Sequence, residues 1–174
     1  MGKVLVVGYG NPLRGDDAIG QVAAQAFLRE AAIEGATAVA CHQLAPELAK
    51  RIATVDLVVF IDASAGGQPG SVTVTRLHSG AGSLTAFSHH VDPSGLLVMA
   101  DHLFGRSPQA FLVAVGAGSL ELGDALSDAV AAALPHVVAT VRHLVLRHLQ
   151  QTTSVERQVS CALNPGQTQR RRST

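Results

Sequence analysis

Short apolar runs alternate with longer segments of helical periodicity along most of the chain. The runs KVLVVG (3–8), DLVVFIDAS (56–64) and AFLVAVGAG (110–118) are almost continuously apolar, which is typical of strands buried on both faces of a sheet. TAVACHQL (37–44) is predicted as a further strand. SVTVTRL (71–77) alternates strictly between apolar and polar residues, which favours an edge or antiparallel strand.

Four segments between these strands have the signals of helices. They are residues 19–27, 46–53, a segment that begins at Asp92 and Pro93, and 127–150. Asp92 and Pro93 are residue types preferred at the N-cap and first position of a helix. Pro135 is expected to kink or restart the last helix, because proline cannot donate the backbone hydrogen bond of a helix interior.

This alternation predicts an α/β fold with three layers, in which a doubly wound, mainly parallel twisted sheet of about five strands carries helices on both faces. Residues 1–150 form this single domain. Residues 151–174 are polar, lack periodicity and contain RRR, so they are predicted to be a disordered polar and basic tail. Ligands bind such sheets outside the carboxyl ends of the strands, which is where functional residues are expected.

The composition excludes several classes of protein. The 174 residues carry 13 basic and 13 acidic side chains, so no net charge attracts nucleic acid or an anionic membrane. We find no signal peptide and no apolar segment of the roughly 18 residues needed to span a bilayer. Cys41 and Cys161 do not form a CxxC pair. These features predict a cytoplasmic protein, with no nucleic acid or membrane partner, that is a monomer.

The segment GYGNPLRGDDAIG (8–20) is a glycine-rich turn between the first strand and the first helix. Gly10 and Gly15 match the glycines of a P-loop, but Asp16 and Asp17 stand where its lysine and its serine or threonine belong. Two carboxylates at this place repel a phosphate, which disfavours a nucleotide-binding protein. Capping of the helix explains one aspartate. We assign Asp16 to this role or to a solvated position, which leaves Asp17 free to face the strand ends.

A second carboxylate and a pair of histidines complete the candidate chemistry. Asp62 ends a nearly apolar strand and needs a partner, a metal or solvent there, unless it only caps the following loop. His89 and His90 lie together before a predicted helix, as surface residues or as metal ligands, whereas His42 stands alone. Two carboxylates and an imidazole suit a divalent transition metal but do not distinguish zinc, nickel and iron. No HExxH or GxSxG motif is present.

These residues carry a family resemblance. VLVVGYGNPLRGDDAIG resembles the N-terminal signature of the hydrogenase maturation proteases, G-x-G-N-x-[LM]-x-x-D-[DE]-x-x-G, in which Gly10 and Asn11 take part. VVFIDA resembles the second acidic strand end of that family and SHH its metal-binding histidine segment. VGAGSLELGDALSDAVAAALPHVV resembles its C-terminal block. The matches stand in the family's order over about residues 3–148.

The resemblance implies a metal-dependent endopeptidase that cleaves the C-terminal extension from the nickel-loaded large-subunit precursor of a [NiFe] hydrogenase. Nickel would be presented by the precursor, and other divalent metals could substitute. Asp17, Asp62 and His90 are the implied metal ligands, with His89 as the alternative to His90. Our mechanistic hypothesis makes Asp17 or Asp62 the general base, and Asp16 supports the turn. The alternative is a non-catalytic metal- or peptide-binding protein on the same fold.

Overall fold

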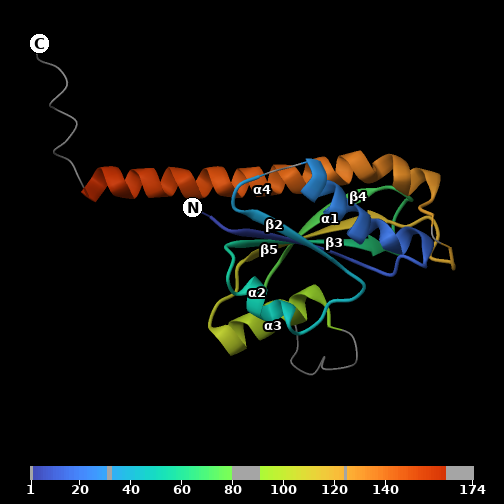
Figure 1. Cartoon of the computed structure of the whole chain (residues 1–174), viewed down its shortest axis with the longest axis horizontal. Helices are drawn as coiled ribbons and strands as arrows, with labels where there is room; N and C mark the ends of the chain where they lie inside the picture. The colour runs from blue at the N-terminus through green and yellow to red at the C-terminus, as the bar shows by residue number, and fades with distance from the viewer. Residues whose placement is uncertain (1, 31–32, 80–90, 124, 164–174) are drawn as a thin grey trace, which may run out of the picture.

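The computed structural model describes residues 2–30, 33–79, 91–123 and 125–163, with only the backbone for 155–163. Its centre is one five-stranded sheet (Figure 1). The strands are β1 (Val4–Tyr9), β2 (Ala36–Cys41), β3 (Leu57–Ser64), β4 (Val72–Leu77) and β5 (Gln109–Gly116). They follow the order β2-β1-β3-β5-β4, and all pairs are parallel except β4 with β5. The predicted antiparallel edge strand is therefore confirmed.

Helices cover both faces of the sheet, so the predicted three-layer α/β fold is also confirmed (Figure 1). On one face lie α1 (Ile19–Glu30) and α4 (Asp128–Leu163), and on the other lie α2 (Leu48–Ile52) and α3 (Pro93–Phe104). Helix α3 begins as its sequence predicts: the Asp92 carboxylate accepts a hydrogen bond from the Gly95 N–H at 2.6 Å.

Strand β1 shows why its sequence is continuously apolar. Val4 and Val6 pack into the cluster under α1 and α4, whereas Leu5 and Val7 pack into the cluster under α2 and α3. All four side chains are at most 1% exposed. Burying an aliphatic side chain of this size contributes about 1.5–3 kcal/mol to folding, so each face of the strand stabilises the sheet.

Two glycines let the first turn of α1 lie directly against β1. A Cβ at Gly8 would stand 1.8 Å from the Gly20 carbonyl oxygen, and a Cβ at Gly20 would stand 2.2 Å from the Tyr9 carbonyl oxygen. Neither position accepts a side chain without moving backbone. This close approach places the short 3-10 turn η1 (Gly15–Ala18), which carries both neighbouring aspartates, at the carboxyl end of β1.

Helix α4 is longer than predicted. It contains Pro135 without a restart and continues past residue 150 to Leu163, so the tail predicted to be disordered is helical over 151–163. Extending a formed helix adds a hydrogen bond per residue without a new nucleation cost. The Thr152 hydroxyl also donates to the His148 carbonyl oxygen at 3.1 Å. Residues 164–174 lie outside the described residues.

One described helix is long and apolar enough to cross a membrane, contrary to the expectation that no segment is. It is α4, over Asp128–Ser154. Length and composition alone are weak evidence for a membrane span, because core helices of soluble proteins meet the same test. In this fold Val137, Val141 and Val145 are fully buried in the cluster between α4, α1 and the sheet.

Candidate active site

The glycine turn after β1 fixes the position of the Asp17 carboxylate. Gly10 has a φ of 136°, and a Cβ there would lie 1.9 Å from the Asp17 carbonyl oxygen. Only glycine fits this conformation and this space. The Asn11 N–H donates to Asp17 Oδ2 at 2.7 Å, and Gln21 Nε2 donates to the Gly10 carbonyl oxygen at 2.6 Å. Asp17 is half-buried.

The neighbouring Asp16 is fully buried and points into the protein. Its carboxylate accepts hydrogen bonds from the N–H groups of Gly118, Ser119 and Ser127 at 2.7, 2.9 and 2.7 Å. The Ser127 hydroxyl donates a fourth, at 2.8 Å. Burial alone would raise the pKa of Asp16, but these hydrogen bonds hold it below its ordinary value. Asp16 thus ties the glycine turn to the loop between β5 and α4.

Asp62 lies near the end of β3, beside Tyr9 at the end of β1. The parallel register pairs Gly8 with Ile61, so the next two residues along stand side by side. Burial raises the pKa of Asp62 and the charge of Asp17 adds to this, against hydrogen bonds from the Tyr9 hydroxyl and the Ala63 N–H. Burial and the neighbouring Asp62 also raise the pKa of Tyr9, which keeps its hydroxyl protonated as a donor.

Asp17 and Asp62 line one cleft of about 300 Å³ at the carboxyl ends of β1, β2 and β3. The cleft is lined by Tyr9, Gly10, Asp17, His42, Gln43, Leu44, Asp62, Ala63 and Val91. The two carboxylates come from different strand ends and lie close enough for the charge of one to raise the pKa of the other. The structure therefore brings together the two acidic residues that the sequence singled out.

One histidine with a described position, His42, lines this cleft. His89 and His90, the predicted imidazole ligand and its alternative, lie outside the described residues; Val91, which follows them, lines the cleft. His42 stands alone in the sequence, yet it lines the cleft from the loop after β2. Cys41 pairs with Tyr9 in the sheet register, so position 42 directly follows a strand end beside the site. The strand predicted over 37–44 ends at Cys41 in the structure, three residues earlier, which places His42 directly after a strand end.

The cleft suits a cation or a peptide better than a phosphate, because both of its charged groups with described positions are carboxylates. Within the described parts of the chain, no three His, Cys, Asp or Glu side chains are grouped to hold a metal. Asp17 and Asp62 therefore provide two oxygen donors, and a metal site would need further ligands. A carboxylate kept in a partly buried cleft can also accept a proton from water.

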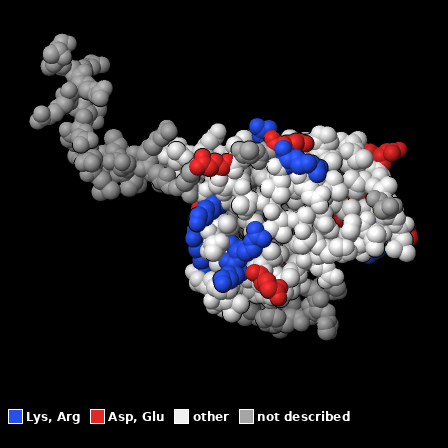
Figure 2. Space-filling view, in the orientation of Figure 1, with Lys and Arg blue, Asp and Glu red and all other residues white. Residues whose placement is uncertain are grey.

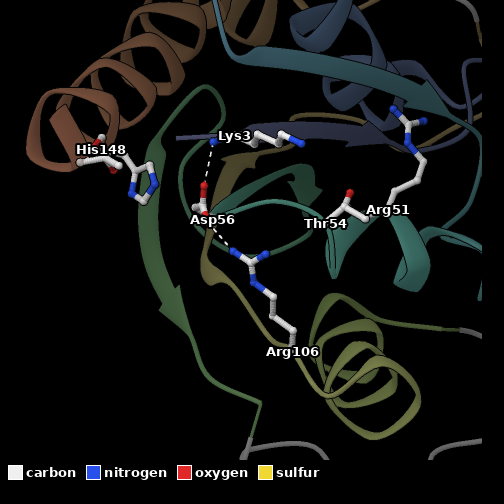
Figure 3. Close-up of polar contacts among 7 residues, drawn as sticks. Lys3, Arg51, Thr54, Asp56, Arg106 and His148 are labelled. Atoms are coloured by element: carbon white, nitrogen blue, oxygen red, sulfur yellow. Dashed lines mark hydrogen bonds and ion pairs between the residues drawn. The ribbon is translucent and has the colours of Figure 1, made fainter. Parts of the chain in front are cut away.

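A second cavity, of about 380 Å³, lies at the opposite end of the sheet, where Lys3 and Arg51 line it. Figure 2 shows a group of basic side chains on this part of the surface. Nearby, the Asp56 carboxylate accepts hydrogen bonds from the Lys3 N–H at 2.8 Å and from the Arg106 guanidinium (Figure 3). Burial lowers the pKa of the neighbouring His148. This region lacks the paired carboxylates of the first cleft, and we assign it no chemistry.

Comparisons with known proteins give structural but not sequence matches. No protein-family model and no curated protein sequence matches the chain. The hydrogenase maturating endopeptidase HybD from E. coli is similar in structure, with a TM-score of 0.66, 24% identity and coverage of 84% of this chain and 93% of that chain. The [NiFe] hydrogenase maturation protease HycI from Thermococcus kodakarensis has a TM-score of 0.67 and 21% identity, covering 80% of this chain and 89% of that chain.

A further solved structure, an endopeptidase from Escherichia coli, has a TM-score of 0.61 and 26% identity, with 80% of this chain and 89% of that chain covered. These comparisons cover most of each chain, so the likeness concerns the whole α/β domain rather than one motif. The chain therefore shares the fold of the [NiFe] hydrogenase maturation proteases, the family whose motifs its sequence resembles.

Proposed function

We propose that this chain is an endopeptidase that removes the C-terminal extension from the nickel-loaded large-subunit precursor of a [NiFe] hydrogenase. The observation that carries the proposal is the meeting of Asp17 and Asp62 in one cleft at the carboxyl ends of the strands. The shared fold supports it, because the similar solved structures are named as endopeptidases of hydrogenase maturation. Fold alone would not decide the activity, since one fold serves many functions.

Nickel belongs to the substrate in this proposal, and the chain recognises it. Asp17 and Asp62 are hard oxygen donors, and the family resemblance adds the imidazole of His90, or of His89. The partners of Asp62 are the Tyr9 hydroxyl and the Ala63 N–H, which are neutral, so no described cation competes with a metal there. Other divalent metals could occupy the same ligands. A precursor would therefore bind in the cleft for cleavage only if it carries its metal.

Cleavage is hydrolysis of a peptide bond. A carboxylate of Asp17 or Asp62 takes a proton from water, the water oxygen attacks the carbonyl carbon, and the amide nitrogen receives a proton as the bond breaks. A carboxylate that binds a metal is a poor base, because the positive charge lowers its pKa. The two aspartates therefore have separable roles. One binds the nickel-bearing segment, and the other acts as the general base on water.

The activity is tested by mixing the purified chain with a matched precursor in nickel-loaded and nickel-free forms. We expect a shortened product only from the nickel-loaded form, detected by the mass of the released C-terminal peptide. Asp17→Asn, Asp62→Asn and His90→Ala should each block the cleavage, and His78→Ala, outside the cleft lining, is the matched control.

The alternative is a metal- or peptide-binding protein without catalysis. It predicts that the same precursor binds but keeps its full mass.

The cellular setting and oligomeric state belong to the proposal as well: we propose a cytoplasmic protein that acts as a monomer. Cell fractionation and sedimentation of the purified chain test these two points separately from the activity.

A further inference from the structure

Two loops at the carboxyl end of the sheet pair with each other beside the candidate site. The Gly123 N–H donates to the Leu13 carbonyl oxygen at 3.0 Å, and the Gly15 N–H donates to the Gly123 carbonyl oxygen at 2.6 Å. These bonds make a parallel bridge between Arg14 and Gly123. Residues one step before the bridge, Leu13 and Leu122, are therefore neighbours along the two paired loops.

Both leucines are exposed to solvent. Leu13 is 61% exposed and Leu122 is 88% exposed, the largest value among the described large apolar side chains. A single exposed leucine needs no explanation, but two on adjacent loops form a small apolar surface. We call Leu13 and Leu122 together the leucine pair.

The leucine pair is held in place rather than carried on a loose loop. Arg14 Nε donates to the Leu120 carbonyl oxygen at 3.1 Å, which is a second link between the two loops. The buried Asp16 carboxylate binds the start and the end of the second loop, at Gly118 and Ser127. A surface fixed in this way loses little conformational entropy when a partner covers it.

The leucine pair is also continuous with the candidate site. The Leu13 N–H donates to Asn11 Oδ1 at 2.9 Å, and the Asn11 N–H donates to Asp17 Oδ2 at 2.7 Å. Neither leucine lines the cleft itself. At the right-hand end of Figure 1 the two loops lie together. A ligand that fills only the cleft would leave the pair exposed, so what covers it must be larger than the segment bound in the cleft.

We propose that the leucine pair is a docking contact for the folded body of the hydrogenase large-subunit precursor, an inference that rests on the proposed function. The C-terminal extension of the precursor enters the cleft, and an apolar patch beside the origin of that extension covers Leu13 and Leu122. The contact positions the extension and leaves the chemistry to the cleft. Its loss should therefore weaken binding of the precursor without slowing the bound complex.

The test uses Leu13→Ser, Leu122→Ser and the double variant in the full chain, with nickel-loaded precursor as substrate. We expect KM to rise roughly tenfold for each leucine, with kcat unchanged. The chain offers matched controls in Leu103 on α3, 70% exposed, and Leu28 on α1, 51% exposed. Leu28 and Leu103 both lie near the C-terminal ends of their helices, whose N-terminal ends are at the carboxyl end of the sheet. Leu103→Ser and Leu28→Ser should leave KM unchanged, and thermal melts verify that all variants fold.

A direct binding titration with the same precursor separates this inference from the proposed function. Binding that the double variant weakens, without any cleavage by the wild type, would support the docking contact while the endopeptidase proposal fails. Equal affinity of the wild type, the double variant and Leu103→Ser would overturn the docking contact even if cleavage occurs. A wild-type dimer that the double variant dissociates would assign the surface to a second copy and would also overturn it.

Discussion

Two aspartates at opposite ends of β3 have opposite surroundings. Asp56 precedes the strand, where a hydrogen bond from the Lys3 N–H, partly opposed by burial, and the positive charge of Arg106 hold its pKa below the ordinary value. Asp62 stands near the carboxyl end, where burial and the nearby Asp17 raise its pKa. The surroundings therefore stabilise the charged form of Asp56 and destabilise the charged form of Asp62.

The difference separates residues that support the fold from residues that serve a ligand. A charged group that is fully hydrogen-bonded or ion-paired within the protein stabilises the fold, and it has few free lone pairs with which to bind a substrate. A charge kept in a cleft beside a like charge costs stability, and such positions are typical of functional sites. The same contrast separates Asp16 from Asp17: four hydrogen bonds from described groups satisfy the first, and the second lines the cleft.

The strongest way to break this comparison is to neutralise Asp62. Asp62→Asn should lower the cleavage rate by on the order of 10³-fold, because it removes a base or a metal ligand. The melting temperature should stay equal or rise, because repulsion from Asp17 is relieved. Asp56→Asn is the matched control and should lower stability with little effect on cleavage. Initial rates and thermal melts of both variants measure these effects. A loss of stability in Asp62→Asn together with a loss of cleavage in Asp56→Asn would contradict the comparison.

The next effect in size concerns Asp16. Asp16→Ala should lower the free energy of unfolding by roughly 3 kcal/mol, because it leaves buried donors on three residues, Gly118, Ser119 and Ser127, without their acceptor. Urea denaturation measures the loss. Asp16→Asn keeps one acceptor oxygen and should lose less. Equal stability of Asp16→Ala and wild type would show that Asp16 does not hold the two loops together.

The sequence predicts the fold and the acidic pair for clear physical reasons. Strands buried on both faces must be continuously apolar, so β1, β3 and β5 are visible in the sequence. The rule that parallel strands end at one edge then places Asp17 and Asp62 together. Helix capping, the role assigned to Asp16 from the local sequence, is wrong. The Asp16 carboxylate instead accepts hydrogen bonds from Gly118, Ser119 and Ser127, more than 100 residues later, and the local sequence does not reveal these partners.

Other features depend on contacts that the sequence does not display. His42 reaches the cleft only because β2 lies beside β1 in the sheet, and nothing near it in the sequence indicates that neighbour. Leu122 comes beside Leu13 only because Arg14 and Gly123, more than 100 residues apart, form a bridge. The extension of α4 to Leu163 is not predicted for another reason. Polar residues without periodicity can still prolong a helix that packing has already formed.

A smaller and sharper test concerns the Tyr9 hydroxyl. Tyr9→Phe keeps the ring and removes the hydroxyl that lowers the pKa of Asp62. We expect kcat to fall roughly 10- to 100-fold with KM unchanged, since a hydrogen bond to a charged group contributes about 1.5–3 kcal/mol. Gln43→Ala, another change in the cleft lining, is a control that leaves Asp62 oriented. If Tyr9→Phe alters only the melting temperature, the hydroxyl supports the fold and does not position Asp62.

The smallest expected effect lies at the other end of β3. Arg106→Gln should lower the free energy of unfolding by about 0.5–1 kcal/mol at pH 7, because both partners in the Arg106–Asp56 ion pair are partly exposed.

The depressed pKa of Asp56 stabilises the fold above the unfolded-state value, about 3.9, and this stabilisation disappears as the pH falls through the lower folded-state value. The difference between Arg106→Gln and wild type should therefore be constant from pH 5 to 7 and shrink as the pH falls below the unfolded-state pKa of Asp56. Denaturant melts across this range measure it, and a difference that grows in acid would contradict the role given to Asp56. Cleavage by Arg106→Gln should match the wild type, because the pair lies at the end of the sheet away from Asp17 and Asp62.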